Sequence, residues 1–253
     1  MCQTLPTALR NFFEQHPRAA LAFSGGADSA YLLYAARECG CQLKAYLVYT
    51  PFQPAFEVED AVRLARELGV ELQILKLDIL RQKEIQKNPT DRCYHCKKAL
   101  FTHLCEAARK DGYDLILDGT NASDDVNDRP GMRALMELGV VSPLRLCKVT
   151  KDALRQFSKQ AGLFTWNKPA YACLATRIPE GVPITAQALQ NIEQTEGKIH
   201  ALGFSDFRVR MTRDGGARLQ IHASQWTKAA SMREELCDAL AGFSWACLDF
   251  KTR

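Results

Sequence analysis

The sequence predicts an α/β fold, in which a parallel, doubly wound sheet is followed by a small α+β domain. In the N-terminal part, short apolar segments alternate with segments of helical periodicity, and this order is typical of βαβ units. Further along, a helical segment precedes two segments of alternating polarity, and Asp214-Gly215-Gly216 between them is typical of a hairpin turn. We expect the change of pattern to mark two domains, residues 1–177 and 178–253.

The elements of the first domain are expected to follow one another as strand and helix. Strands are predicted at residues 20–23, 44–49, 71–77 and 115–117. Helices are predicted after Ser29 and at residues 56–68, 97–110 and 150–162. In the second domain we predict a helix at 188–202 behind the cap residue Thr185, strands at 207–212 and 217–222, a helix at 226–240 and a strand at 245–250. The parallel sheet should carry helices on both faces and bind its ligand beyond the carboxyl ends of its strands.

The loop Ser24-Gly25-Gly26-Ala27-Asp28-Ser29 links the first strand to the first helix and is the candidate nucleotide site. Its glycines allow close backbone approach, and its amides join those of the helix N-terminus, where phosphate oxygens bind. Ser24 and Ser29 add hydroxyl groups, and Asp28 suits a Mg²⁺ ion beside the phosphates. The simpler interpretation is a strand-to-helix turn in which Asp28 or Ser29 caps the helix. The sequence lacks the Gly-x-x-x-x-Gly-Lys-Ser/Thr motif of kinases and GTPases.

Composition indicates an ordinary soluble protein. The 253 residues are 47% hydrophobic and 25% charged, and the net charge is +4. This mild positive charge suits an anionic small molecule and is too low to predict nucleic-acid binding. The sequence has no apolar run as long as the roughly 20 residues of a membrane span, and Met1-Cys2-Gln3-Thr4 does not begin a signal peptide. We therefore expect a cytoplasmic protein without a membrane partner.

Ten cysteines are present, and most lie in apolar or helical surroundings. Because the context of a secreted protein is missing, a disulfide framework is not indicated. Cys2 is expected to be incidental, and the following are expected to be small core residues: Cys39, Cys41, Cys105, Cys147, Cys237 and Cys247. Cys93-Tyr94-His95-Cys96 has metal-ligand spacing but supplies only half of a zinc site, so a redox or fortuitous pair is an equal alternative.

Cys173 lies at the end of Lys168-Pro169-Ala170-Tyr171-Ala172-Cys173, between the two expected domains. Together with Cys93 and Cys96 it would provide three thiolates and leave one iron of a [4Fe–4S] cluster without a protein ligand. Two alternatives remain. Cys173 is either a catalytic thiol whose pKa is lowered by Lys168 and Arg177, or a buried small residue.

These segments together resemble the LarE-type sulfur transferases of nickel-pincer nucleotide synthesis, which belong to the adenylating ATP pyrophosphatases with a pyrophosphate loop. The resemblance covers nearly the whole chain in the family's order, and the Cys173 segment is its most specific part. The matching stretches are residues 23–29, residues 88–101 with Arg92-Cys93-Tyr94-His95-Cys96-Lys97, residues 118–124, Asp128-Arg129-Pro130-Gly131, residues 166–179, Gly203-Phe204 and Arg208-Val209-Arg210. The resemblance implies an adenine-nucleotide α-hydrolase-like topology. We further expect a homo-oligomer.

The resemblance also implies a two-stage reaction with ATP and Mg²⁺. ATP activates a carboxylate of a pyridinium dicarboxylate mononucleotide as an acyl-adenylate, pyrophosphate leaves, and sulfur then attacks the carbonyl to give a thiocarboxylate. The residues implied for the nucleotide are Ser24, Gly25, Gly26, Asp28, Ser29, Gly119, Thr120 and Asn121, and those for the anionic substrate are Arg177, Arg208 and Arg210. Arg208 and Arg210 lie two apart on a strand and so share a face, although a solvated basic face is an alternative.

The family offers two sulfur sources. In one branch the thiolate at the position of Cys173 is sacrificed and becomes dehydroalanine. In the other branch three cysteines hold a [4Fe–4S] cluster whose free iron carries hydrosulfide, and Cys93 and Cys96 favour this branch. Gln220 departs from the family, which often has an acidic residue there, so the resemblance does not extend to a metal or subunit contact at that position.

Three other classes of protein share parts of this pattern. A tRNA-thiolating enzyme would need a basic RNA-binding extension, which the sequence does not show. An amidating ligase of the NAD-synthetase kind uses ammonia and needs no reactive cysteine. A nucleotide sensor with a structural metal site would leave Cys173 beside basic residues unexplained. Pyrophosphate release with a pyridinium dicarboxylate would separate an enzyme from a sensor.

Overall fold

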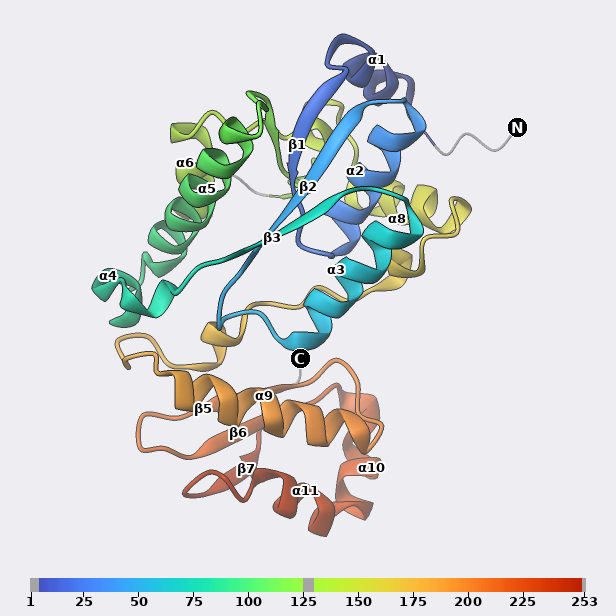
Figure 1. Ribbon diagram of the computed structural model, residues 1–253. Coiled ribbons are helices and arrows are strands. Elements are labelled where there is room, and N and C mark those ends of the chain that lie inside the picture. The colour runs from blue at the N-terminus through green and yellow to red at the C-terminus, as the bar shows by residue number, and fades with distance from the viewer. Residues whose placement is uncertain (1–4, 125–129, 252–253) are drawn as a thin grey trace. The chain divides into compact units, whose positions relative to one another are not determined.

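Two compact units make up the computed structural model, which describes residues 5–124 and 130–251 (Figure 1). The first unit comprises Met1–Ile79 and Asp91–Tyr171, and the second comprises Leu80–Thr90 and Ala172–Arg253. The expected division into domains after residue 177 stays a prediction. Among the described residues, no helix combines the length and the apolar character that crossing a membrane requires.

The first unit is built on a parallel sheet. In its described residues the strand order is β3 (Leu72–Lys76), β2 (Gln42–Tyr49), β1 (Arg18–Ala22) and β4 (Ile116–Leu117), and each neighbouring pair is parallel. Leu21 of β1 is in register with Leu117 of β4. The predicted α/β fold with a parallel sheet is therefore confirmed, and the loops that follow β1 and β4 begin side by side.

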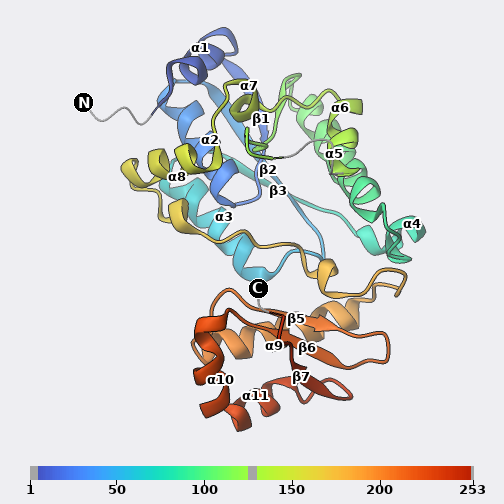
Figure 2. The ribbon, with the colours of Figure 1, turned by 180° about the vertical axis from the view of Figure 1, so that it is seen from behind.

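Alternating side chains of β1 separate two hydrophobic layers. Ala19 and Leu21 pack into one core, whereas Ala20 packs into another with Leu104 and Cys105. The first layer includes α1 (Thr7–Gln15), α2 (Ala27–Glu38), α3 (Ala55–Glu67), α7 (Pro143–Leu146) and α8 (Lys151–Gln160), which leads into η2 (Phe164–Asn167). The opposite side carries α5 (Arg92–Lys110) and α6 (Pro130–Glu137) (Figure 1 and Figure 2). Helices thus cover both faces of the sheet, as predicted.

The second unit contains a mixed sheet. In its described residues the strand order is β5 (Arg208–Met211), β6 (Ala217–Gln220) and β7 (Ala246–Leu248). β5 and β6 are antiparallel, which confirms the predicted hairpin, and β7 is parallel to β6. Val209 and Leu219 face a core shared with α9 (Ala186–Ala201), α10 (Trp226–Ser231) and α11 (Arg233–Leu240). The unit also includes the short segments α4 (Lys83–Gln86), η3 (Leu174–Arg177) and η4 (Ala223–Gln225), and η1 (Ile79–Arg81) begins at the last residue of the first unit's N-terminal segment.

Two helices differ from the prediction. The helix predicted at residues 226–240 is interrupted at Met232, whose backbone angles of φ −112° and ψ 34° are not helical, so α10 and α11 are separate. The helix predicted from residue 97 begins at Arg92, so Cys93 and Cys96 lie on it. The predicted helix ends at glycines 69, 112 and 162 are confirmed, since each has a positive φ.

The cysteines expected in the core fall into three groups, which are buried, half-buried and exposed, and Cys39 is half-buried. Cys41 and Cys105 are buried, and burial raises the pKa of both thiols, to about 11 for Cys41. Burial also raises the thiol pKa of half-buried Cys147. Cys237 and Cys247 are exposed, so the core position predicted for them was wrong: they occupy outward-facing positions of α11 and β7.

Candidate functional site

The loop between β1 and α2 is held together by its two serines. Ser24 Oγ lies 3.1 Å from Ser29 Oγ, and the backbone N–H of Ser24 donates to Ser29 Oγ at 3.3 Å. Ser29 Oγ donates to the carbonyl of Gly26 at 3.2 Å, and the N–H of Gly26 donates to Ser24 Oγ at 3.4 Å. These bonds curl the loop around the start of α2, where the first backbone N–H groups lack helical acceptors. The loop therefore has the form of an anion-binding turn.

Two glycines allow the loops after β1 and β4 to meet. Gly25 has a φ of +72°, and a Cβ atom there would lie 2.8 Å from Cβ of Ala61 on α3. At Gly119, which follows β4, a Cβ atom would lie 2.9 Å from the backbone N of Ser29. A side chain at either position would push the loop away from its neighbour. The structure thus requires glycine at two positions predicted to bind the nucleotide.

Asp28, in the first turn of α2, is paired with a lysine that the sequence analysis missed. Lys151 Nζ, at the start of α8, donates to the two carboxylate oxygens of Asp28 at 2.8 and 2.7 Å. Asn121 Nδ2 donates to Oδ1 of the same carboxylate at 3.2 Å. The side chains of Lys151 and Asp28 are 30% and 29% exposed, so the pair is accessible to a ligand. A cation and an anion therefore lie beside the loop amides, where a metal-bound phosphate chain needs both.

Local hydrogen bonds fix the segment that follows β4. The Asn121 side-chain oxygen accepts from the N–H of Ser123 at 2.8 Å, which leaves its amide group to face Asp28. Asp118 is buried and accepts hydrogen bonds from the hydroxyl groups of Thr120 and Ser142. Thr120 thus supports Asp118, and its contact with a nucleotide stays a prediction.

Lys168 also contacts the glycine loop. Its Nζ donates to Asp60 Oδ2 at 2.7 Å and to the carbonyl of Gly25 at 3.4 Å, and lies 3.8 Å from Glu57 Oε1. The Lys168 side chain is only 13% exposed. Its charge is therefore compensated by two carboxylates of α3, which does not support the alternative in which Lys168 lowers the pKa of the Cys173 thiol.

Cys93 and Cys96 lie near the N-terminus of α5, on one side of the helix because they are three residues apart. Cys93 is exposed and Cys96 is half-buried, and Arg92 Nη2 donates to Cys93 Sγ at 3.8 Å. The residues that the structure describes include no group of three or more His, Cys, Asp or Glu side chains arranged to hold a metal ion. Convergence of these two thiols with Cys173 stays a prediction.

Arg177 and Glu196 hold the turn that begins at Cys173 in the second unit. Nε and Nη2 of Arg177 donate to the two carboxylate oxygens of Glu196 at 3.0 and 3.1 Å. Nη1 donates to the carbonyl of Ala172 at 2.6 Å, and the hydroxyl of Thr176 donates to the carbonyl of Cys173 at 2.7 Å. The Arg177 side chain is fully buried, which favours a role in holding this turn. Its contact with substrate stays a prediction.

The outer face of the second unit's sheet carries several arginines. Arg208 lies opposite Gln220 and Arg210 lies opposite Arg218, so Arg208 and Arg210 share one face, as their spacing predicts. Burial lowers the pKa of Arg210, and the charges of Arg177 and Arg218 lower it further. Like charges directly opposite each other destabilise a sheet. Asp249 Oδ2 lies 3.7 Å from Arg218 Nη1 and compensates that charge, and the Arg208 side chain is buried. Binding of an anionic substrate by Arg208 and Arg210 stays a prediction.

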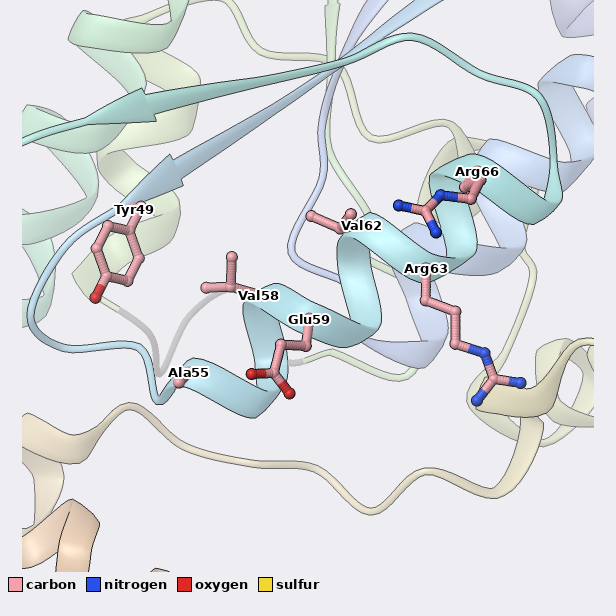
Figure 3. Close-up of a pocket in the computed structure, with 7 residues that line it drawn as sticks. All are labelled: Tyr49, Ala55, Val58, Glu59, Val62, Arg63 and Arg66. Atoms are coloured by element: carbon pink, nitrogen blue, oxygen red, sulfur yellow. The ribbon is translucent and has the colours of Figure 1, made fainter.

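A hollow of about 420 Å³ lies beside the end of β2 and one flank of α3 (Figure 3). Its lining residues are Tyr49, Ala55, Val58, Glu59, Val62, Arg63 and Arg66. These α3 positions lie on a different side of the helix from Ala61, which would meet a side chain at Gly25. The predicted nucleotide-binding residues do not line this hollow.

The structure brings together most residues predicted for the nucleotide: Ser24, Gly25, Gly26, Asp28, Ser29, Gly119 and Asn121. The sequence analysis missed Lys151 and Glu196. The position of Lys151 directly after the helix cap Thr150 gave one usable signal, because it put a cation at the start of a helix where a basic residue is unfavourable. Cys2, Asp128 and Arg129 lie outside the described residues.

Comparisons with known proteins identify relatives that cover most of the chain. No protein-family model matches it. An uncharacterized protein of Synechocystis sp. is 34% identical over 86% of this chain and 81% of its own length. The pyridinium-3,5-bisthiocarboxylic acid mononucleotide synthase of Lactiplantibacillus plantarum is 32% identical over 83% of this chain and 76% of its own length. The tRNA-specific 2-thiouridylase MnmA of Thermotoga sp. is 24% identical over 72% of this chain and 62% of its own length.

Proposed function

The chain belongs to the family of the pyridinium-3,5-bisthiocarboxylic acid mononucleotide synthase, the LarE-type sulfur transferases, and we propose that it uses ATP to convert a carboxylate into a thiocarboxylate. The proposed substrate is a pyridinium dicarboxylate mononucleotide, and the proposed pathway is nickel-pincer nucleotide synthesis. The observation that carries this proposal is the anion-binding loop at residues 24–29, with the ion pair of Asp28 and Lys151 beside it.

In the first step, an oxygen of the substrate carboxylate attacks the α-phosphorus of ATP, and pyrophosphate leaves. The N–H groups of Gly25 and Gly26 and the hydroxyl groups of Ser24 and Ser29 would receive the phosphate oxygens. Mg²⁺ held by Asp28 would neutralise charge on the leaving pyrophosphate. Lys151 would exchange Asp28 for a phosphate oxygen, so nucleotide binding would replace one ion pair by two ionic contacts.

In the second step, a sulfur nucleophile attacks the carbonyl of the acyl-adenylate, and AMP leaves. The mixed anhydride is reactive because AMP is a far better leaving group than the oxide of a free carboxylate. We propose that Cys93, Cys96 and Cys173 bind a [4Fe–4S] cluster, which would supply an iron for hydrosulfide. This part of the proposal depends on the sequence pattern alone. Sacrifice of the Cys173 thiol is the alternative.

The anionic substrate is assigned to the outer face of the second unit's sheet. Arg208 and Arg210 would bind its phosphate or its second carboxylate through charge-assisted hydrogen bonds. Burial lowers the pKa of Arg210 and the neighbouring guanidinium groups lower it further, and the negative charge of a bound anion would offset both effects by favouring the charged form.

The test is pyrophosphate release by anaerobically purified protein supplied with Mg²⁺ and ATP. We expect release that depends on the pyridinium dicarboxylate mononucleotide and that is lost in Asp28→Ala. Release that depends on tRNA would favour a tRNA-thiolating enzyme, and release that depends on ammonia would favour an amidating ligase. ATP binding without release under any of these conditions would favour a nucleotide sensor.

A further inference from the structure

Gln220 connects an arginine of the sheet's outer face to a carboxylate at the end of β7. Arg210 Nε donates to Gln220 Oε1 at 2.5 Å, and Gln220 Nε2 donates to Asp249 Oδ2 at 2.8 Å. Arg210 lies on β5, Gln220 on β6, and Asp249 directly after β7. The three side chains thus form a hydrogen-bonded row across neighbouring strands.

The chemistry of the two partners determines how the Gln220 amide is oriented. A carboxylate can only accept hydrogen bonds and a guanidinium can only donate them. The NH₂ group of Gln220 must therefore face Asp249, and its oxygen must face Arg210. A carboxylate at position 220 would instead face the carboxylate of Asp249, and the two like charges would repel. Asp249 therefore favours a neutral amide at position 220.

Asp249 is itself held in place by the backbone. Its N–H donates to the carbonyl of Leu219 at 2.9 Å, and its Oδ1 accepts from the N–H of Lys251 at 2.9 Å. Its Oδ2 lies 3.7 Å from Arg218 Nη1, and the side chain is 14% exposed. Asp249 therefore offers Gln220 a fixed acceptor.

Arg210 is fixed by a second contact. Its Nη1 donates to the carbonyl of Thr176 at 3.0 Å, in addition to the bond from Nε to Gln220. These bonds engage two of the five N–H donors of a guanidinium. Because the group is planar, two contacts determine its plane and hence the direction of the remaining donors.

We infer that Gln220 and Asp249 are positioning residues that orient the guanidinium of Arg210 toward the anionic group of the substrate. The inference rests on the proposed function, in which Arg210 binds that anion. A neutral glutamine orients the arginine without neutralising it, whereas a carboxylate would compete with the substrate for its charge. Asp249 supplies the acceptor that keeps the glutamine in the required orientation.

Steady-state kinetics of pyrophosphate release test this inference with three variants. Gln220→Leu removes the hydrogen bonds from Arg210 to residue 220 and from residue 220 to Asp249. Asp249→Ala removes the carboxylate that accepts from Gln220. We expect each to raise KM for the pyridinium dicarboxylate mononucleotide at least about tenfold, as for loss of a well-oriented charged hydrogen bond. The KM for ATP and kcat should change less than about twofold. Asp249→Asn has one acceptor oxygen where the carboxylate has two, so it keeps either the bond from Gln220 or the bond from the N–H of Lys251, and its KM for the mononucleotide should lie between those of the unsubstituted protein and Asp249→Ala.

Gln190→Leu, at an exposed position of α9, is the matched control and should leave kcat and the KM values for ATP and for the mononucleotide unchanged. A purely structural role would lower thermal stability without a selective effect on this KM. Folded Gln220→Leu and Asp249→Ala proteins with an unchanged KM for the mononucleotide would overturn the inference and leave the proposed function intact. Unsubstituted protein that releases no pyrophosphate with the mononucleotide would overturn the proposed function, and the inference with it.

Discussion

Lys151 Nζ contacts both carboxylate oxygens of Asp28, at 2.8 and 2.7 Å, and so joins the start of α8 to the first turn of α2. The contact compensates the charge of a carboxylate that also accepts a hydrogen bond from the neutral amide of Asn121. When a phosphate chain with Mg²⁺ is bound, each charge has a new partner of opposite sign. The pair is therefore suited to stabilising the loop before a nucleotide binds and to exchanging partners with the nucleotide.

Replacement of Lys151 tests this exchange. We expect Lys151→Met to lower kcat/KM for ATP in pyrophosphate release by about 10- to 100-fold, because one charge-assisted contact of about 1.5–3 kcal/mol is lost. Lys159→Met, at an exposed position of the same helix, is the control and should retain the original value. A folded Lys151→Met protein with unchanged kcat/KM would limit Lys151 to pairing with Asp28.

The two loop glycines should respond differently to substitution. Gly25→Ala is expected to lower the free energy of unfolding by about 1–3 kcal/mol more than Gly139→Ala, since both have a positive φ but only Gly25 would meet Ala61. Gly26 has a φ of −76°, so Gly26→Val should fold but lose adenylation, because its side chain covers the backbone that receives phosphate. Urea unfolding and pyrophosphate release measure the two effects. Normal adenylation by Gly26→Val would contradict the assigned role of the loop.

Arg208 and Arg210 are expected to act on the anionic substrate and not on ATP. Arg208→Ala and Arg210→Ala should each raise KM for the mononucleotide about 10- to 100-fold, the loss expected for a charged hydrogen bond of about 1.5–3 kcal/mol. KM for ATP should stay within about twofold. Arg233→Ala, at an exposed position of α11, controls for net charge. If KM for the mononucleotide is unchanged in both variants, these arginines do not bind the substrate and their role is structural.

The buried pair of Arg177 and Glu196 should contribute strongly to stability. Glu196→Gln leaves a buried guanidinium without its counter-charge, and we expect the free energy of unfolding to fall by about 3–5 kcal/mol. The exposed pair of Arg63 and Glu67 is the control, and Glu67→Gln should lower the free energy of unfolding by less than about 1 kcal/mol. Equal losses in the two variants would show that Glu196 does not hold the Cys173 turn.

Cysteine variants distinguish the two sulfur sources. If Cys93, Cys96 and Cys173 bind a cluster, the anaerobic protein is brown, each Cys→Ala variant loses iron and sulfide, and turnover continues when sulfide is supplied. Cys105→Ala, in the core of the first unit, is the control and should keep the cluster. A colourless enzyme that stops after one turnover and carries dehydroalanine at Cys173 would contradict the cluster and leave the adenylation step standing.

Local patterns made the sheet and the loop predictable. The apolar segments and the run from Ser24 to Ser29 carry their signals within a few residues, so β1, α2 and the glycine-containing turn between them follow from the sequence. The division of the last helical region at Met232 was not predictable in this way, because residues 226–240 have continuous helical periodicity.

Contacts between distant residues were the part that the sequence could not predict. Lys151 is 123 residues from Asp28 in the chain, and Arg210 reaches Thr176 across 34 residues. Such pairs depend on how helices and strands pack, which periodicity does not specify. The same applies to Gln220, whose orientation becomes evident only when Asp249 lies beside it.

The central claim is that ATP-dependent adenylation of a carboxylate leads to its conversion to a thiocarboxylate. The most direct measurement is mass spectrometry of the mononucleotide after anaerobic incubation with the protein, ATP, Mg²⁺ and isotopically labelled sulfide. The account predicts a product in which one carboxylate oxygen is replaced by sulfur, formed together with AMP and pyrophosphate, and absent with Asp28→Ala. A mononucleotide of unchanged mass, recovered while ATP is cleaved to AMP and pyrophosphate, would contradict it.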